Sequence, residues 1–375
     1  MSLSTRTEYE HTLQALGICI SAHIPVLLWG APGEGKTAVV ESAAQQGWHV
    51  ETLIVSHYEP SDFAGLPVIG ADGSVTLAPP GWATRLAAVD GPSIAFFDEF
   101  STASPALQAA ALRPLTHFQV GSLQLPDTVS FVAAANPADV AASGWELAAP
   151  TASRFVHLDW ALPLEVYAEC LITGAWPPLP VYSTPDEQFA AQAQQRVLVA
   201  GFLRARESQI SAIPADAAAR GRAFPTPRTW DYATRLAAFA VAIGAPKEVL
   251  RLLVNGCIGE VTAHEFLAWS AAQDLPDPET LLADPHGFDF TGVRPDRVYV
   301  ILQSILAAVS RTTTPQRWTD AVTLCAVAAK AAGIDPAVPV ARALMRNGMR
   351  PADTPLPACI TVFAPALALA GLLTP

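Results

Sequence analysis

The chain has 375 residues, of which 51% are hydrophobic and 15% charged, so it can bury the cores of two or three domains and is not disordered. Its 34 acidic and 22 basic residues give a net charge of −12, which disfavours nucleic-acid binding over a broad surface. Five widely spaced cysteines form no CxxC pair and no Cys/His metal spacing, and the first residues carry no apolar signal segment. These features predict a cytoplasmic protein with reduced thiols.

The first elements frame a glycine-rich loop. A helix is predicted over residues 7–22, and the short apolar run Pro25–Trp29 is typical of a buried strand. The sequence GAPGEGKT follows, and residues 38–44 then form a helix-favouring run without Gly or Pro. A strand, a glycine loop and a helix in this order are the setting that a phosphate-binding loop requires.

This loop fits the pattern G-x-x-x-x-G-K-[ST] at every specified position. Its backbone N–H groups and the helix N-terminus favour phosphate, the lysine reaches the outer phosphates, and the Thr37 hydroxyl suits Mg²⁺. The alternative is a glycine-rich turn with an incidental lysine, which the flanking strand and helix disfavour. The predicted nucleotide-binding residues are Gly30, Ala31, Pro32, Gly33, Glu34, Gly35, Lys36 and Thr37.

Strand and helix patterns continue to alternate up to about residue 160, which predicts an α/β fold: a parallel sheet with helices on both faces. Two apolar runs around Asp72-Gly73 and a segment folded at Gly121-Ser122 predict hairpins. The predicted strands are 48–55, 92–97 and 129–134, the helices 82–88 and 105–115, and the hairpins 66–77 and 118–125.

The chain becomes helical after a Pro-rich boundary near residue 172. We therefore expect an α/β nucleotide-binding domain over 1–172 with hairpin inserts near 56–80 and 118–126, a helical lid and connecting region over 173–310, and a C-terminal helical extension over 311–375. Residues 354–375 carry no charge, but Pro357 and Pro365 interrupt their apolar run, so a buried helix or partner-binding element is favoured over a membrane span. The predicted helices are 187–210, 229–243, 246–256, 259–271, 297–311, 315–332 and 336–347.

Polar residues at two strand ends complete a candidate hydrolysis site. Asp98 and Glu99 close the buried apolar strand 92–97, where an aspartate can hold Mg²⁺ and a neighbouring glutamate can polarise the attacking water. Asn136 follows the strand 129–134, which we place beside the strand that leads into the loop, and its amide could orient that water. The alternatives are a solvated acidic pair and an Asn-Pro turn.

Two arginines are further candidates. Arg154 follows the last predicted strand and could act on the ATP of a neighbouring subunit, whereas Arg228 lies in the first turn of a helix, where a cation is unfavourable without a function. A surface arginine or an intrachain ion pair is the alternative for Arg154, and Arg228 could reach the phosphates from the second domain. The sequence has no HExxH and no G-x-S-x-G, and lone histidines such as His117 and His157 are more typical of packing or surface residues than of metal ligands.

With these residues assembled, the chain resembles the MoxR-type AAA+ ATPases, the clade with one hairpin inside the second helix and another before sensor 1. Gly30–Thr37 resembles Walker A, Phe96–Glu99 Walker B, Asn136 sensor 1, Ser153–Phe155 the arginine-finger segment and Thr226–Arg228 the sensor-2 arginine. The resemblance implies ATP and Mg²⁺ as cofactors, a ring that is usually a hexamer with ATP between subunits, and a protein partner, often of the von Willebrand A type.

Two function classes follow. The first is an ATPase that remodels or chaperones a protein, and the second is a nucleic-acid-dependent motor of the same clade. DNA-tracking hairpins should carry Lys or Arg, but residues 69–74 and 121–124 have neither, so the protein remodeller is favoured and nucleic acid is not the expected partner. A nucleotide-gated switch with little turnover is disfavoured because Glu99 is present.

Overall fold

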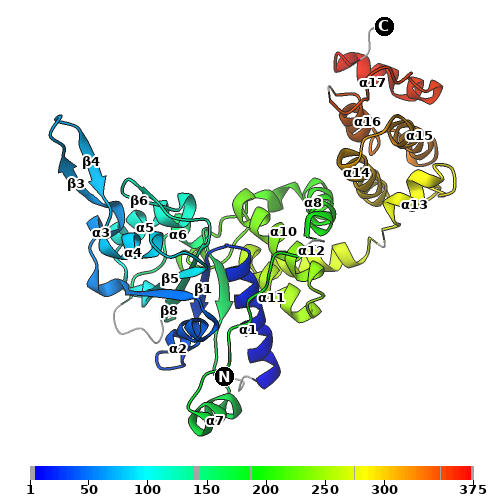
Figure 1. The fold of residues 1–375 in the computed structure, drawn as a ribbon. Coiled ribbons are helices and arrows are strands. Elements are labelled where there is room, and N and C mark those ends of the chain that lie inside the picture. Colours follow the sequence, from blue (N-terminus) through cyan, green and yellow to red (C-terminus); the bar gives the residue numbers. More distant parts are fainter. Residues whose placement is uncertain (1–4, 138–143, 186–187, 274, 347, 373–375) are drawn as a thin grey trace. The chain divides into compact units, whose positions relative to one another are not determined.

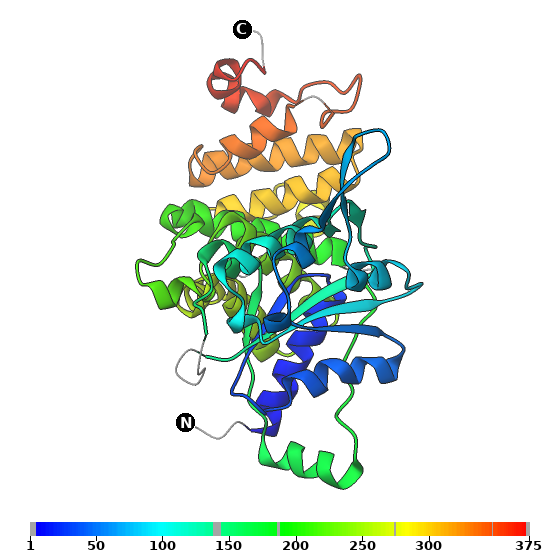
Figure 2. The same cartoon turned by 90° about the vertical axis from the view of Figure 1, so that its left-hand side faces the viewer.

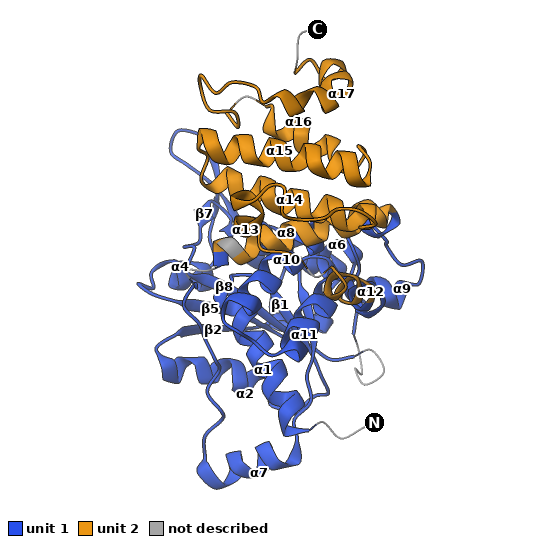
Figure 3. Ribbon diagram, turned by 90° about the vertical axis from the view of Figure 1, so that its right-hand side faces the viewer, with its two compact units in different colours: residues 1–188, 208–264 blue, residues 189–207, 265–375 orange. Residues whose placement is uncertain are grey.

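The computed structural model describes residues 5–137, 144–185, 188–273, 275–346 and 348–372. The chain divides into two compact units, coloured separately in Figure 3. Unit 1 comprises residues 1–188 and 208–264, and unit 2 comprises residues 189–207 and 265–375. The three-part division at residues 172 and 310 stays a prediction.

Unit 1 is built around a parallel five-stranded sheet in the order β2-β5-β8-β1-β9. The register sets Trp29 of β1 opposite Ala135 of β8 and Asp159 of β9, so these strands end at the same edge of the sheet. The sequence predicts that the strand leading into the loop and the strand before Asn136 lie side by side, and the pairing of β1 with β8 confirms this. The five strands are β1 (Val26–Trp29), β2 (His49–Ile54), β5 (Ser93–Asp98), β8 (Val129–Ala135) and β9 (Val156–Asp159).

The central strands are buried on both faces because their apolar runs are continuous. Alternate side chains such as Phe97 and Phe131 enter one large core with Trp82 of α4 and Leu107 of α5. The side chains between them, such as Phe96, are equally buried on the opposite face, where α1 contacts β1, β8 and β9. The predicted parallel sheet with helices on both faces is therefore confirmed.

Several helices of unit 1 begin at a residue whose side chain caps the first turn. Thr5 and Glu8 form a capping box at α1, Ser104 caps α5 ahead of Pro105, and Thr226 caps α10 ahead of Pro227. The helices are α1 (Arg6–Ser21), α2 (Lys36–Glu41), α3 (Ser61–Ala64), α4 (Gly81–Ala87), α5 (Pro105–His117), α6 (Ala149–Ala152), α7 (Leu164–Thr173), α9 (Ala217–Arg220), α10 (Pro227–Ala242) and α11 (Lys247–Ile258), and the first residues of α12 (Glu260–Ala271) also belong to this unit.

Both predicted hairpins are present, and they touch. β3 (Leu66–Ile69) pairs with β4 (Val75–Ala78), and β6 (Gln119–Val120) pairs with β7 (Leu123–Gln124). The Ser122 N–H donates to the Leu77 carbonyl, at 2.9 Å, which joins the second hairpin to the base of the first. The β3–β4 hairpin projects from unit 1 in Figure 1.

The segment after residue 150 corrects one sequence expectation. Arg154 does not follow the last strand of the sheet; it precedes β9, the edge strand that pairs with β1. This strand was missed because it has only four residues, Val-His-Leu-Asp, and its pairing is non-local. The helix α7 was also missed. In Figures 1 and 2 it stands away from the rest of unit 1, and its Leu164, Leu171 and Ile172 side chains are exposed.

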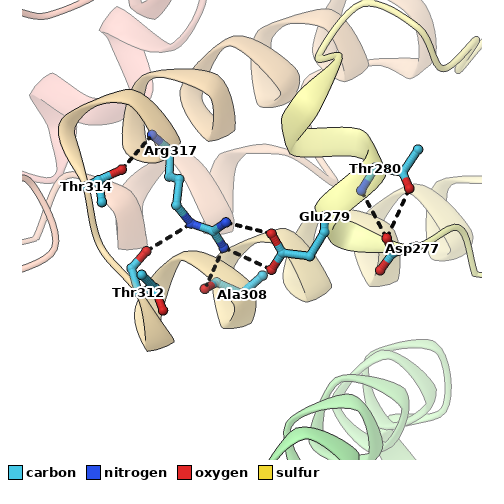
Figure 4. A network of polar contacts seen from close by, with 7 residues as sticks. All are labelled: Asp277, Glu279, Thr280, Ala308, Thr312, Thr314 and Arg317. Atoms are coloured by element: carbon cyan, nitrogen blue, oxygen red, sulfur yellow. Dashed lines mark hydrogen bonds and ion pairs between the residues drawn. The ribbon is translucent and has the colours of Figure 1, made fainter.

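Unit 2 is helical, as predicted for the second half of the chain. Its core gathers apolar side chains of α14 and α15 around the buried Trp318. Arg317 of α15 connects its helix to α13 and α14. Its guanidinium donates to both carboxylate oxygens of Glu279 in α13, at 2.6 and 3.0 Å. It also donates to the carbonyls of Ala308 in α14 and of Thr312, which follows α14 (Figure 4). The helices are α8 (Gln188–Ala205), most of α12, α13 (Pro278–Ala283), α14 (Pro295–Arg311), α15 (Pro315–Ala332), α16 (Val338–Leu344) and α17 (Ala364–Leu369).

The uncharged C-terminal segment forms the 3-10 turn 358–363 and α17, which bury Ile360, Phe363 and Leu367 in this core. Residues 373–375 of the segment lie outside the described residues. Across the described ranges, no helix has the length and apolar character that a membrane crossing needs.

Candidate functional site

The carboxyl ends of β1, β5 and β8 open onto a cavity of about 310 Å³. Because parallel strands present their carboxyl ends at one edge, residues distant in sequence meet here. The cavity is lined by Pro32, Gly33, Glu34, Gly35, Lys36, Thr37, Ala38, Asp98, Glu99, Ala134 and Asn136. It therefore gathers six of the eight loop residues together with Asp98, Glu99 and Asn136.

Lys36 lies at the centre of this cluster and is buried. Its ammonium donates to the Gly30 and Ala31 carbonyls, at 2.7 and 2.9 Å, and to Asn136 Oδ1, at 3.0 Å. Burial lowers the pKa of Lys36, and the negative charges of Glu34 and Asp98 oppose that effect. The lysine and the asparagine are thus held together across 100 residues of sequence.

Thr37 and Asp98 form the part of the site that suits a hard cation. The Thr37 hydroxyl donates to the Asp98 carboxylate at 2.7 Å. Among the described residues, no group of three or more His, Cys, Asp or Glu could hold a metal ion. A hydroxyl and one carboxylate nevertheless fit Mg²⁺, which usually takes only one or two protein ligands and completes its shell with phosphate and water.

Glu99 occupies an unusual backbone conformation next to Asp98. Its φ is +55°, in the left-handed region that non-glycine residues seldom adopt, and its N–H donates to Asp98 Oδ1 at 2.9 Å. The exposed carboxylate accepts a long hydrogen bond from the Ser56 hydroxyl, at 3.4 Å. The strand end therefore turns the glutamate side chain toward the cavity that it lines.

Two tryptophans that sequence reasoning missed hold the loop from outside. The Trp160 indole N–H donates to the Glu34 carbonyl at 2.9 Å. Trp176 packs so closely on Gly35 that any Cβ at this position would clash with its ring, and Gly35 also has a φ of +74°. The sequence contains little indication of either, because Trp160 directly follows the short strand β9, which was not predicted, and Trp176 lies in the Pro-rich segment.

Arg154 and Arg228 come together elsewhere. The Arg154 guanidinium donates to the Thr116 hydroxyl at 2.6 Å and to the Pro150 carbonyl at 2.5 Å, and Arg228 donates to the Ser153 hydroxyl at 3.3 Å. Burial and the positive charge of Arg228 lower the pKa of Arg154. Neither arginine lines the cavity of the loop. The structure thus separates these two candidates from the other predicted site residues.

His157 connects the two regions. Its Nδ1 accepts from the indole N–H of Trp29, at 2.9 Å, and its Nε2 lies 3.0 Å from the Ala152 carbonyl. Trp29 directly precedes the loop, and Ala152 belongs to the short helix before Arg154. Burial lowers the pKa of His157 to about 4. The histidine is a packing residue, as the sequence indicated.

Comparison with known proteins identifies the domain. Residues 25–155 match the family model of the AAA domain, dynein-related subfamily. This part of the chain therefore has the fold of an AAA domain. The match begins at the strand before the loop and ends at Phe155, so it includes the loop, Asp98, Glu99, Asn136 and Arg154 but not β9, α7 or unit 2.

The αβα fold followed by helices that we expected from the sequence is confirmed. Among solved structures, a "putative ATPase" from Cytophaga hutchinsonii is similar at 16% identity, with a TM-score of 0.43, over 69% of this chain and 88% of that chain. The search of curated proteins finds no match.

Proposed function

We propose that the chain is a MoxR-type AAA+ ATPase that hydrolyses ATP between the subunits of a ring, which we expect to be a hexamer, and uses the energy to remodel a protein partner. The AAA domain supports ATP use with Mg²⁺. The assembly, the partner and the roles of single residues are our proposals.

Hydrolysis is assigned to the cavity at the strand ends. The loop N–H groups and Lys36 would bind the phosphates of ATP, and Thr37 and Asp98 would hold Mg²⁺, which neutralises developing charge. Glu99 would accept a proton from the attacking water, and Asn136, bonded to Lys36, would orient that water or contact the outer phosphate. Each group already lines the cavity, so no rearrangement of the sheet is needed to bring them together.

Completion of the site is assigned to a neighbouring subunit. Arg154 and Arg228 form one cationic pair outside the cavity of their own loop. An arginine that acts on a γ-phosphate must reach it directly, so this pair would serve the nucleotide of the next subunit. This placement supports a ring in which each ATP lies between two copies.

The hairpins support a protein as the partner. Leu66, Val68, Ile69 and Val75 of the β3–β4 hairpin expose 48 to 75% of their surfaces. Contiguous exposed apolar side chains are typical of protein contacts, whereas a hairpin that follows DNA needs cations for the phosphates. The only charged side chain between Leu66 and Ala78 is Asp72. Because the β3–β4 hairpin is apolar and has no cation, we propose a protein partner, such as one of the von Willebrand A type, rather than nucleic acid.

The discriminating experiment compares ATPase rates of the full chain alone, with DNA, with RNA and with a permanently unfolded protein. We expect stimulation by the unfolded protein and little by nucleic acid. Replacing the paired residues Ile69 and Val75 by serine should abolish the stimulation and leave the basal rate, because these side chains face solvent and do not line the cavity of the loop. Thr76→Ser, on the other face of β4, is the control. Strong stimulation by DNA or RNA would favour the nucleic-acid motor instead.

A further inference from the structure

Glu34 places a carboxylate inside the phosphate-binding loop. Its Oε2 accepts a hydrogen bond from the Ala31 N–H at 3.2 Å. The same oxygen lies 3.1 Å from where a Cβ on Gly30 would stand, so the side chain folds back over the start of the loop. Glu34 also lines the cavity together with Lys36 and Thr37. An acidic side chain thus shares the space that binds phosphate.

The backbone of the loop is held independently of this side chain. Trp160 binds the Glu34 carbonyl, and Trp176 packs on Gly35. The Lys36 ammonium fixes the carbonyls of Gly30 and Ala31. Because these contacts use main-chain atoms or neighbouring residues, the Glu34 carboxylate can rotate away while the loop keeps its shape.

The charge of Glu34 acts on the cavity. It is the first of the two negative charges that raise the pKa of Lys36 against the effect of burial. A nucleotide phosphate bound by Lys36 and the loop N–H groups would meet the same charge and be repelled by it. A carboxylate bonded to a loop N–H and a phosphate therefore compete for one positively polarised region.

We propose that Glu34 is an internal competitor of the nucleotide phosphates, a residue that weakens nucleotide binding and turns outward when ATP or ADP binds. This inference rests on the proposed ATPase function. It assigns Glu34 a role in setting affinity and product release rather than in the chemical step. The competing explanation is that the bond to Ala31 only shapes the loop.

Two substitutions separate these explanations. Glu34→Gln removes the charge but keeps an oxygen that can accept from Ala31, and Glu34→Ala removes both. The dissociation constants of ADP and of a slowly hydrolysed ATP analogue, each with Mg²⁺, would be measured by calorimetry on the full chain. Competition predicts roughly tenfold tighter binding in both variants, the effect of one nearby charge at a partly exposed site. The difference in dissociation constant between each variant and the unmodified chain should become smaller as the salt concentration is raised, because salt screens the charge of Glu34.

Glu41→Gln is the matched control, because Glu41 ends α2, the helix that follows the loop, and its carboxylate accepts a hydrogen bond from the Thr52 hydroxyl on the surface. Unchanged affinity in Glu34→Gln would overturn the proposal, and weaker binding in Glu34→Ala alone would assign Glu34 to loop shape instead. A thermal unfolding curve for each variant confirms that it is folded. If the unmodified chain itself binds neither nucleotide, the proposed ATPase function fails. That result differs from equal affinities of the unmodified chain and Glu34→Gln, which would overturn only the role of Glu34.

Discussion

The loop cavity and the arginine pair differ in how their charges are satisfied. In the cavity, Lys36 is bonded to Asn136 and lies near Glu34 and Asp98, and Thr37 is bonded to Asp98. Arg154 and Arg228 bind only hydroxyl and carbonyl oxygens in the described part of the chain. The first region contains both signs of charge, whereas the second is a pair of cations with no carboxylate partner among the described residues.

Like charges held side by side and partly buried cost free energy, which the lowered pKa of Arg154 reflects. Such a pair is stabilised by an anion from outside. In the ring that we propose, the cavity would therefore be nearly self-contained and the arginine pair would be one half of the site of the next subunit. This asymmetry is what a nucleotide shared by two subunits requires.

Replacement of Arg154 by alanine is expected to have the largest effect. Loss of an arginine that stabilises the transferred phosphate typically reduces turnover by about 10³-fold or more. Binding of ATP by isolated subunits should be unchanged, since Arg154 does not line the cavity. Steady-state ATPase rates of the assembled protein, together with calorimetric affinities, measure both quantities.

Arg206→Ala is a suitable control because Arg206 is an exposed arginine paired with Glu265. Arg228→Ala should resemble Arg154→Ala if the two form one functional pair. Full activity of Arg154→Ala in the assembled ring, or a loss of nucleotide affinity in single subunits, would contradict the division between the two regions.

Substitution of Glu99 by glutamine tests the role of the loop cavity in hydrolysis. The amide cannot accept a proton, so we expect hydrolysis to fall by about 10²- to 10³-fold. ATP should still bind, because Lys36 and Thr37 are untouched. Single-turnover hydrolysis and equilibrium binding distinguish the two steps, and proteins that co-purify with this variant in ATP would reveal the partner.

Ser56→Ala, which removes only the long hydrogen bond to the Glu99 carboxylate, serves as the control. Turnover of Glu99→Gln equal to that of the unmodified chain would remove Glu99 from the mechanism.

Much of the first region could be predicted because its signals are local. The glycine loop, the apolar strand before Asp98 and the strand before Asn136 are each visible in a few consecutive residues. The parallel arrangement then follows from their alternation with helices, and it places their carboxyl ends together. The sequence also indicated both hairpins through Asp72-Gly73 and Gly121-Ser122.

The second region could not be predicted in the same way because its contacts are non-local. Arg228 lies beside Arg154 only because α10 returns to Ser153, which precedes Arg228 by 75 residues in the chain. The short strand β9 has no distinctive pattern, and the role of Trp176 depends on a Pro-rich segment that crosses the loop. The fold-back of Glu34 is likewise invisible in the motif, which leaves that position unspecified.

His157 gives the smallest expected effect and tests the connection between the regions. The indole of Trp29 can only donate, so Nδ1 must accept and the proton of the neutral ring lies on Nε2, facing Ala152. Protonation of Nδ1 would place its N–H against the indole N–H of Trp29, and because both groups are donors the hydrogen bond between them would be lost. The folded-state pKa of about 4 lies below the ordinary value of 6.5, so the unfolded chain binds this proton first as pH falls. The free energy of unfolding should therefore decrease between about pH 6.5 and 4, by up to about 3 kcal/mol from this residue.

Denaturant unfolding of the full chain and of His157→Gln at pH 7.5 and pH 5 isolates that contribution. Glutamine can accept from Trp29 and donate to Ala152 without titrating, so its stability should fall less over this interval. His23, whose pKa burial also lowers, is present in both proteins and cancels in the difference. Equal pH dependence in the two proteins would contradict a buried neutral His157. A smaller loss in the variant would mean that acid weakens the bond between the strand that carries the loop and the segment that carries Arg154.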